Sequence, residues 1–379
     1  MAMGLRQAAG SLLVVGLGGT ELTGLERAWL RLIQPGGIIL FKRNVAHATQ
    51  TRALLQEAIG FCVPHAMRSV DVEGGTVNRL RDALAPLPST QAVGAVMRST
   101  GKPAFAFEHG VLIARAVKAF GFDTALAPVI DLGLPESAKV MGSRCAGPTW
   151  QDVVDYARPF LAGIKREGIV SCGKHFPGLG GGVVDSHFET PEIRRPWQSI
   201  WSDDLAPYRE LRDELPTVMV NHAAYPETQS KNAPASASTF WITNILRKRI
   251  GYRGLIVSDD LEMGGILKFL PVDEAAVASL RAGTDQMLIC HSAELILRSY
   301  ESLVREAERS SAFRTLLLAR AREVKTKQAR LFATKTSRAL TPQQLDALRA
   351  KILAFGETIA AQAQGDIIDP RAASPAEAS

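Results

Sequence analysis

Residues 169–191, IVSCGKHFPGLGGGVVDSHFETP, read as a buried strand that runs out into a glycine-rich loop. We predict the strand over Ile169 to Lys174, where apolar and small residues lead up to a charged end. Glycines in the loop remove the constraint of a β-carbon and let the backbone come close to a ligand. Asp185 and His187 stand two positions apart, so the carboxylate can fix one tautomer of the imidazole and raise its basicity. An isolated D-x-H pair is common in polar loops. Whether this loop takes part in catalysis therefore has to be judged from the other segments of the chain.

Further runs of the same kind alternate with amphipathic segments along the chain, which is typical of repeated βα units. The predicted strands are Leu12 to Val15, Gly37 to Phe41, Ala66 to Asp71, Thr124 to Val129, Ile169 to Lys174, Thr217 to Asn221, Leu255 to Ser258 and Gln286 to Cys290. The predicted helices between them are Leu22 to Gln34, Thr49 to Ala58, Ala104 to Phe120, Trp150 to Glu167, Asp204 to Leu215, Thr239 to Ile250 and Glu274 to Ala282. This α/β pattern fits a (β/α)8 barrel or an open doubly wound sheet.

Polar residues at the predicted strand ends favour the barrel, because in a barrel these ends converge on one mouth. They are Asp71, Asp131, Lys174 with His175, Asn221 with His222, Asp259, and His291. Each alone could be a helix cap or a loop residue. We therefore predict a TIM barrel in residues 1–292, C-terminal helices packed on it in residues 293–367, and a disordered tail in residues 368–379.

Composition excludes several classes of function. The net charge of +6 over 379 residues lies largely on C-terminal helical segments, and we expect solvated helix faces rather than a nucleic-acid surface. The four cysteines show no metal-binding or disulfide spacing, which favours a reducing, cytoplasmic location and no metal. No apolar run reaches the about 18 residues that span a bilayer. The start, MAMGLRQAAGSLLVVGLGG, has the outline of a signal peptide, so secretion remains the alternative.

Two further segments bring candidate chemistry to strand ends. GLIVSDDLEM, residues 254–263, delivers Asp259 on a rigid strand end, where a carboxylate is well placed for nucleophilic attack. We expect its neighbour Asp260 to cap the following helix. VDVEGGTVNRL, residues 70–80, brings Asp71, around which Arg79 or Arg144 can add donors for a polar ligand such as a sugar. The first turn, GLGG at residues 16–19, lacks the third glycine of a dinucleotide loop, and we expect no cofactor.

Together with VMVNHAAYP, residues 218–226, these segments resemble glycoside hydrolase family 3, and in particular its single-domain bacterial β-N-acetylhexosaminidases. The resemblance runs from about Ser11 to Cys290 with all motifs in order. It implies a retaining hydrolase of terminal β-linked N-acetylglucosamine, with muropeptides of peptidoglycan recycling as the expected small-molecule substrate. A monomer is favoured, with neither nucleic acid nor membrane as a partner.

The resemblance also implies roles for individual residues. Asp259 would be the nucleophile and His187 the general acid/base, with Asp185 as its partner. The expected substrate-binding residues are Asp71, Arg79, Arg144, Lys174 and His175, together with His222 and Met263 from matching segments. Since a neutral imidazole repels an anionic acceptor less than a carboxylate does, phosphorolysis stays open beside hydrolysis.

Two departures from the family pattern stand in this sequence. Leu179 replaces a usual loop histidine, and Cys145-Ala146 follows Arg144 where serine and an aromatic residue are common. The first concerns the conformation of the loop, and the second the position of Arg144. A β-glucosidase of the same family and a non-catalytic sugar-binding barrel remain the alternatives.

Overall fold

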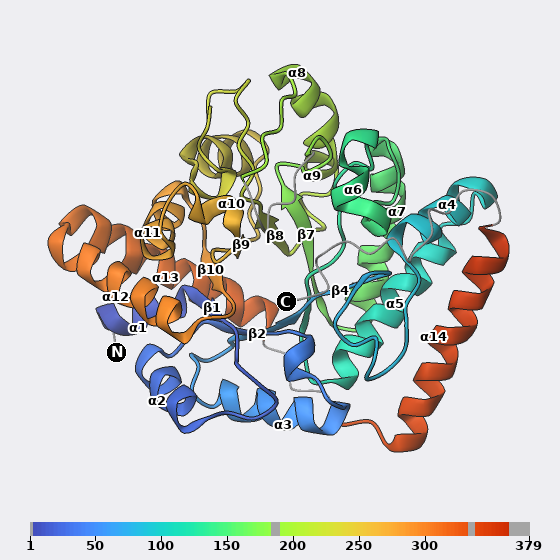
Figure 1. Ribbon diagram of the computed structural model, residues 1–379, viewed down its shortest axis with the longest axis horizontal. Coiled ribbons are helices and arrows are strands. Elements are labelled where there is room, and N and C mark those ends of the chain that lie inside the picture. Colours follow the sequence, from blue (N-terminus) through green and yellow to red (C-terminus); the bar gives the residue numbers. More distant parts are fainter. Residues whose placement is uncertain (1–2, 183–189, 333–337, 364–379) are drawn as a thin grey trace.

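The computed structural model describes residues 3–182, 190–332 and 338–363 (Figure 1). Its centre is a closed barrel of parallel strands in the order β1-β10-β9-β8-β7-β6-β3-β2. The barrel strands are β1 Leu13–Val15, β2 Gly37–Leu40, β3 Met67–Val70, β6 Thr124–Ala125, β7 Val170–Phe176, β8 Thr217–Val220, β9 Leu255–Asp260 and β10 Gln286–Ile289. The ring closes where Val14 of β1 pairs with Gly37 and with Leu288. The predicted (β/α)8 barrel is therefore confirmed, and the alternative of an open doubly wound sheet is excluded.

The barrel strands follow the predicted apolar runs because both of their faces are covered. Every residue of β1, β2, β8 and β10 is buried, which fits near-continuous apolar runs rather than an alternating pattern. The observed ends agree with the predicted ones to within two residues, except in the fourth strand. That strand ends at Ala125, and Pro128 shortly after it has no N–H to continue the ladder.

Helices surround the barrel (Figure 1). The helices are α1 Leu5–Ser11, α2 Gly24–Ile33, α3 Ala48–Ile59, α4 Thr90–Thr100, α5 Ala104–Ala119, α6 Ala138–Met141, α7 Trp150–Arg166, α8 Trp197–Ser199, α9 Ala206–Glu210, α10 Gly264–Leu267, α11 Val272–Ala282, α12 Ala293–Arg309, α13 Ser311–Leu331 and α14 Pro342–Gln362. Ile200–Asp204 and Phe240–Arg249 form π-helices, and β4 Val72–Gly74 pairs with β5 Val77–Asn78 in a separate hairpin.

Several local predictions differ from the structure. The predicted helix from Asp204 to Leu215 is shorter, because Asp204 ends a π-helix and α9 ends at Glu210. The helices α1 and α4 and the β4–β5 hairpin were not predicted. Asp260 does not cap a helix: it is the last residue of β9, and Met263 is the N-cap of α10.

The helices α5 and α7 pack closely against each other. A β-carbon placed on Gly110 of α5 would lie 2.2 Å from the carbonyl oxygen of Phe160. Reciprocally, a β-carbon on Gly163 of α7 would lie 2.3 Å from the carbonyl oxygen of Phe107. Since real β-carbons do not approach an oxygen so closely, both positions require glycine for the two helix backbones to touch.

Asp285, just before β10, fastens α13 to the barrel. Its side chain is fully buried and accepts hydrogen bonds from Arg247, from Lys327 at 2.8 Å and from Arg320 at 3.0 Å. Arg320 and Lys327 belong to α13, while the Ile256 N–H of β9 donates to the same carboxylate at 2.9 Å. One carboxylate therefore joins a late helix to two barrel strands.

The last helix, α14, runs along α4 and α5 on one side of the barrel (Figure 1). Its Arg349 donates to the Leu84 carbonyl at 2.8 Å, and its Phe355 ring stacks near His109 of α5, with 6.0 Å between ring centroids. No helix within the described ranges is both long enough and apolar enough to cross a membrane. The tail expected in residues 368–379 lies outside the described residues.

Candidate active site

One cavity lies at the carboxyl ends of the barrel strands, where the sequence predicted a common site. The predicted site residues that line it are Asp71, Arg79, Arg144, Lys174, His175, Asp259 and Met263. His222 is not among its lining residues. Asp185 and His187 lie outside the residues that the structure describes. The closed barrel thus brings together predicted site residues that are up to 192 positions apart in the chain (Asp71 to Met263).

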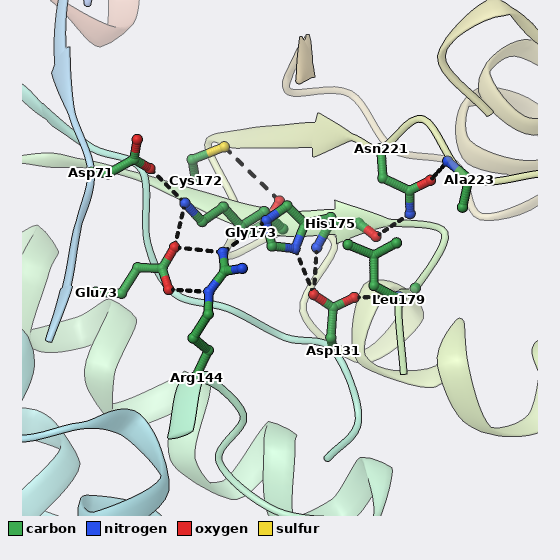
Figure 2. A network of polar contacts seen from close by, with 12 residues as sticks. Asp71, Glu73, Asp131, Arg144, Cys172, Gly173, His175, Leu179, Asn221 and Ala223 are labelled. Carbon is green, nitrogen blue, oxygen red and sulfur yellow. Dashed lines mark hydrogen bonds and ion pairs between the residues drawn. The ribbon is translucent and has the colours of Figure 1, made fainter. Parts of the chain in front are cut away.

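Lys174 is the centre of a buried ion-pair network. Figure 2 shows the other members of the network, Asp71, Glu73 and Arg144. Its Nζ lies 2.6 Å from Asp71 Oδ1 and 2.6 Å from Glu73 Oε1. Arg144 meets the same Glu73 through two hydrogen bonds, Nε to Oε2 at 2.8 Å and Nη2 to Oε1 at 2.9 Å. Two carboxylates and two cations balance in charge, and the bidentate pair fixes the plane of the guanidinium.

The charges in this network reinforce each other. Burial raises the pKa of Glu73, but Arg144 and Lys174 outweigh it and hold the pKa well below its usual value. Burial lowers the pKa of Lys174, whereas Asp71 and Glu73 raise it, so the net shift is upward. Both groups are therefore charged at neutral pH. The network offers charged donors and acceptors at buried positions. Hydrogen bonds are stronger there than at the protein surface.

His175 follows Lys174 at the end of β7 and has a defined tautomer. Arg144 Nη2 lies 3.1 Å from His175 Nε2, and a guanidinium can only donate. His175 Nε2 must then accept, so the proton sits on Nδ1, which lies 2.7 Å from Asp131 Oδ2. Asp131 also accepts from the His175 backbone N–H at 3.1 Å and from the Leu179 N–H at 2.7 Å. These contacts fix the imidazole against the base of the glycine-rich loop (Figure 2).

Asp259 stands near the end of β9 and faces the cavity. The Asp260 N–H donates to its Oδ1 at 2.9 Å. Burial raises the pKa of this carboxyl, but the positive charge of Lys174 and the hydrogen bond from the Asp260 N–H are among the causes that lower it, and the net pKa is below the ordinary value. An ionised carboxylate on a rigid strand end can act as a nucleophile at neutral pH.

His222 lies behind Asp259 rather than in the cavity. It is fully buried, with Nε2 2.9 Å from the Asp260 carbonyl oxygen and Nδ1 2.7 Å from Ser236 Oγ. Because a carbonyl only accepts, Nε2 carries the proton and Nδ1 accepts from Ser236. Burial lowers the pKa of His222, which keeps the ring neutral. The structure therefore separates His222 from the predicted sugar-binding residues.

The remaining predicted residues form the cavity wall. The Arg79 guanidinium lies 5.8 Å from the centre of the Phe41 ring, and Met263 is largely buried. Of the two departures from the family pattern, Leu179 is buried in the cavity wall, and Cys145 is buried beside Arg144. Arg144 keeps its bidentate contact with Glu73.

Sequence reasoning did not assign three residues that the structure brings to the site. They are Glu73, Asp131 and His291. Asp131 and His291 stood among the polar strand ends, and Glu73 follows Asp71 by two positions, so each carried a signal. Within the part of the chain that is described, no group of three or more His, Cys, Asp or Glu side chains is arranged to hold a metal ion.

The chain also matches a known protein family. Residues 5–325 match the model of the glycosyl hydrolase family 3 N terminal domain. A "Beta-hexosaminidase" of Alkalilimnicola ehrlichii is 37% identical over 287 residues, which cover 75% of this chain and 82% of that protein. A "Beta-hexosaminidase" of Pseudomonas aeruginosa is 37% identical over 294 residues, covering 77% and 86%.

Solved structures agree with this match. A family 3 β-N-acetylglucosaminidase from Paenibacillus superposes with a TM-score of 0.82 at 29% identity, covering 94% of this chain and 69% of that one. NagZ from Neisseria gonorrhoeae, in complex with N-trifluoroacetyl-D-glucosamine, superposes with a TM-score of 0.75 at 29% identity, covering 93% and 98%.

Proposed function

The chain belongs to glycosyl hydrolase family 3 and is a glycoside hydrolase, and we propose that it releases terminal β-linked N-acetylglucosamine with retention of configuration. The observation that carries this proposal is the position of Asp259 in a cavity whose wall also presents Asp71, Lys174, Arg144 and His175. The lowered pKa of Asp259 favours its ionised form. The similarity to curated hexosaminidases supports the choice of sugar.

The sugar would be held by the ion-pair network. Lys174 has three N–H donors, and two are directed at Asp71 and Glu73, so a third can reach a hydroxyl group. Asp71 meets Lys174 through Oδ1, and its Oδ2 can accept from a second hydroxyl. Paired acceptors and donors at fixed positions suit the hydroxyl groups of one sugar ring.

The reaction would proceed in two steps. In the first, Asp259 attacks the anomeric carbon while His187 gives its proton to the glycosidic oxygen, which leaves as an alcohol. In the second, His187 takes a proton from water as the water oxygen attacks the anomeric carbon, and the bond to Asp259 breaks. Asp185 would orient His187. The roles of Asp185 and His187 rest on their sequence pattern alone.

His222 would act on Asp259 without touching the sugar. Its N–H holds the carbonyl of the next residue, Asp260, and so fixes the backbone that presents the nucleophile. We therefore assign it as a positioning residue rather than a substrate ligand. Arg79 and Met263 would contribute to the cavity wall on which the substrate rests.

Muropeptides are the substrate class that we propose, and the cytoplasm is the proposed location. The four cysteines are all unpaired, which suits a reducing compartment. We propose a monomer that needs no cofactor. Transfer of the glycosyl group to phosphate instead of water remains the alternative second step, because a histidine acid/base carries no negative charge.

Turnover of p-nitrophenyl β-N-acetylglucosaminide tests the proposal, with the matching β-glucoside as the rival substrate. We expect wild type to prefer the former and Asp259→Asn to lose nearly all activity. His187→Ala should lose about 10² to 10⁴-fold on the methyl β-glycoside, which has a poor leaving group, and less on the p-nitrophenyl substrate. Asp155→Asn, an exposed residue of α7, is the matched control and should keep full activity. Full activity in Asp259→Asn would contradict the mechanism, and preference for the glucoside would contradict the substrate. Binding without turnover would indicate a non-catalytic sugar-binding barrel.

A further inference from the structure

His291 marks the mouth of the cavity. It follows β10, and among the described residues that line the cavity it is the only exposed one, with 36% of its side chain accessible. The groups proposed to hold the sugar lie deep, with Lys174 at 2% and His175 at 4% exposure. His291 is therefore placed to contact a ligand that reaches from the buried wall to solvent.

The imidazole of His291 is fixed from behind by Arg43. Arg43 Nη1 lies 3.0 Å from His291 Nδ1, and because a guanidinium only donates, Nδ1 must accept. Arg43 is itself held by the carbonyl oxygens of Leu17 at 3.0 Å and Cys290 at 2.6 Å. The proton of His291 therefore sits on Nε2.

The Nε2 edge of His291 carries a donor beside an acceptor. Nε2 lies 3.3 Å from Asp260 Oδ2, which is a long contact that leaves the N–H able to bind another oxygen. The ring is also supported by Phe41, with 5.0 Å between ring centroids. An N–H and a carboxylate oxygen side by side match a hydroxyl group, which accepts from one and donates to the other.

The charges nearby favour a neutral ligand at this point. Asp260 and Glu262 line the same part of the cavity, and Glu262 accepts from the His291 backbone N–H at 3.1 Å. An anionic group placed against His291 would meet these carboxylates, and the Arg43 charge lies on the far side of the ring. A hydroxylated, uncharged group fits better.

We propose that His291, with Asp260, binds a hydroxyl group of the leaving-group sugar, and so makes the enzyme selective for glycosides of a second sugar. This inference rests on the proposed function. If the terminal sugar fills the buried end of the cavity, only its anomeric substituent extends toward the mouth. His291 is then a specificity residue for the group that departs.

Three substrates separate this role from others: the N-acetylglucosamine β-1,4-disaccharide, the methyl β-glycoside and the p-nitrophenyl β-glycoside. The methyl glycoside has a poor leaving group without ring hydroxyls, and so controls for proton transfer. His291→Phe keeps a ring and removes the N–H. His65→Asn is the matched control, because His65 is an exposed histidine outside the cavity lining, and asparagine tolerates its φ of 63°.

We expect His291→Phe to lose about tenfold in kcat/KM on the disaccharide, the loss typical of one hydrogen bond, and less than about twofold on the other two substrates. His65→Asn should match wild type on all three. Equal losses on all three substrates, or an unchanged disaccharide-to-methyl ratio, overturn the assignment. Failure of wild type to turn over any of the three overturns the proposed function itself, which is a different result.

Discussion

Asp131 Oδ2 lies 2.7 Å from His175 Nδ1, and the other oxygen of the same carboxylate accepts the Leu179 N–H at 2.7 Å. A single buried side chain thereby holds a cavity-lining imidazole and the first turn of the glycine-rich loop together. Neither bond can be lost without leaving a buried polar group unpaired, which is costly.

We expect Asp131→Asn to lower kcat/KM about 10- to 100-fold, the effect of losing hydrogen bonds to a charged acceptor. An amide can present an N–H to His175 Nδ1, which would force the other tautomer and disturb Arg144. Kinetics on the aryl glycoside and the inhibition constant of free N-acetylglucosamine measure this. Asp155→Asn serves again as the control, and an unaltered inhibition constant in Asp131→Asn would contradict the linkage.

His222→Ala should lower kcat more than it raises KM, because the residue supports the backbone beyond Asp259 and does not line the cavity. His222→Gln should recover part of the loss, since the amide N–H of glutamine can take the place of Nε2–H. Ser236→Ala should show a smaller effect of the same kind. A rise in KM alone would instead indicate a substrate ligand.

The pH profile of kcat/KM should show that Asp259 stays ionised throughout the pH range in which the enzyme is active. Its pKa is lowered, so Asp259 is ionised at neutral pH, and the midpoint of its protonation lies below the ordinary value near 3.8. We expect the acid limb of kcat/KM in His187→Ala, assayed on the aryl glycoside, to lie below about pH 4. An acid limb with a midpoint above pH 5 in that variant would count against the assignment.

Asp285→Asn should destabilise the protein by about 3 to 5 kcal/mol at pH 7, because it leaves three cations without their buried carboxylate. Burial raises the pKa of Asp285, but the positive charges of Arg247, Lys327 and Arg320 lower it by more, so the net pKa lies below the usual value. The carboxylate thus stabilises the fold above about pH 4, and the stabilisation is lost as pH falls through the lowered pKa.

Urea unfolding at pH 7 and at progressively lower pH measures this effect. Asp346→Asn removes an exposed partner of Arg349 and should change stability by less than about 1 kcal/mol. The difference between wild type and Asp285→Asn should narrow below pH 4, and a difference that stayed constant there would exclude the charge as its cause.

Gly110→Ala should destabilise the α5–α7 contact by about 1 to 3 kcal/mol, since the added methyl group meets the Phe160 carbonyl. Gly356→Ala on α14 is the opposite case, because no atom lies within 4 Å of its β-carbon position. It should stabilise the helix by about 0.5 to 1 kcal/mol. Thermal unfolding of both variants measures the two changes in stability. A stabilising effect of Gly110→Ala would show that helix propensity outweighs packing at this position.

The strands and the cavity were predictable, because both follow from short-range signals. Apolar runs mark the buried strands, and polar residues at their ends mark the mouth. Four predicted site residues at strand ends, Asp71, Lys174, His175 and Asp259, line one cavity for that reason. Arg79, Arg144 and Met263 also line it, but no strand-end signal marked them.

Side-chain contacts across the barrel could not be predicted from the sequence. Glu73 meets Arg144 from 71 positions away, and nothing local to either residue indicates that bond. His222 was grouped with the sugar ligands because its segment matches the family, yet its ring turns toward Ser236 and the Asp260 carbonyl. Side-chain direction at a strand end depends on the twist of the whole barrel, which no single segment encodes.

The closure of the barrel has a consequence for association between molecules. Each of the eight barrel strands pairs with two others, as β1 does with β2 and β10, so none of them presents a row of unpaired N–H and C=O groups. Such rows are the templates on which β-rich aggregates grow. Aggregation through these strands therefore requires the barrel to open first. The ion pairs of Asp285 with Arg320 and Lys327 of α13 are among the contacts that hold the barrel closed.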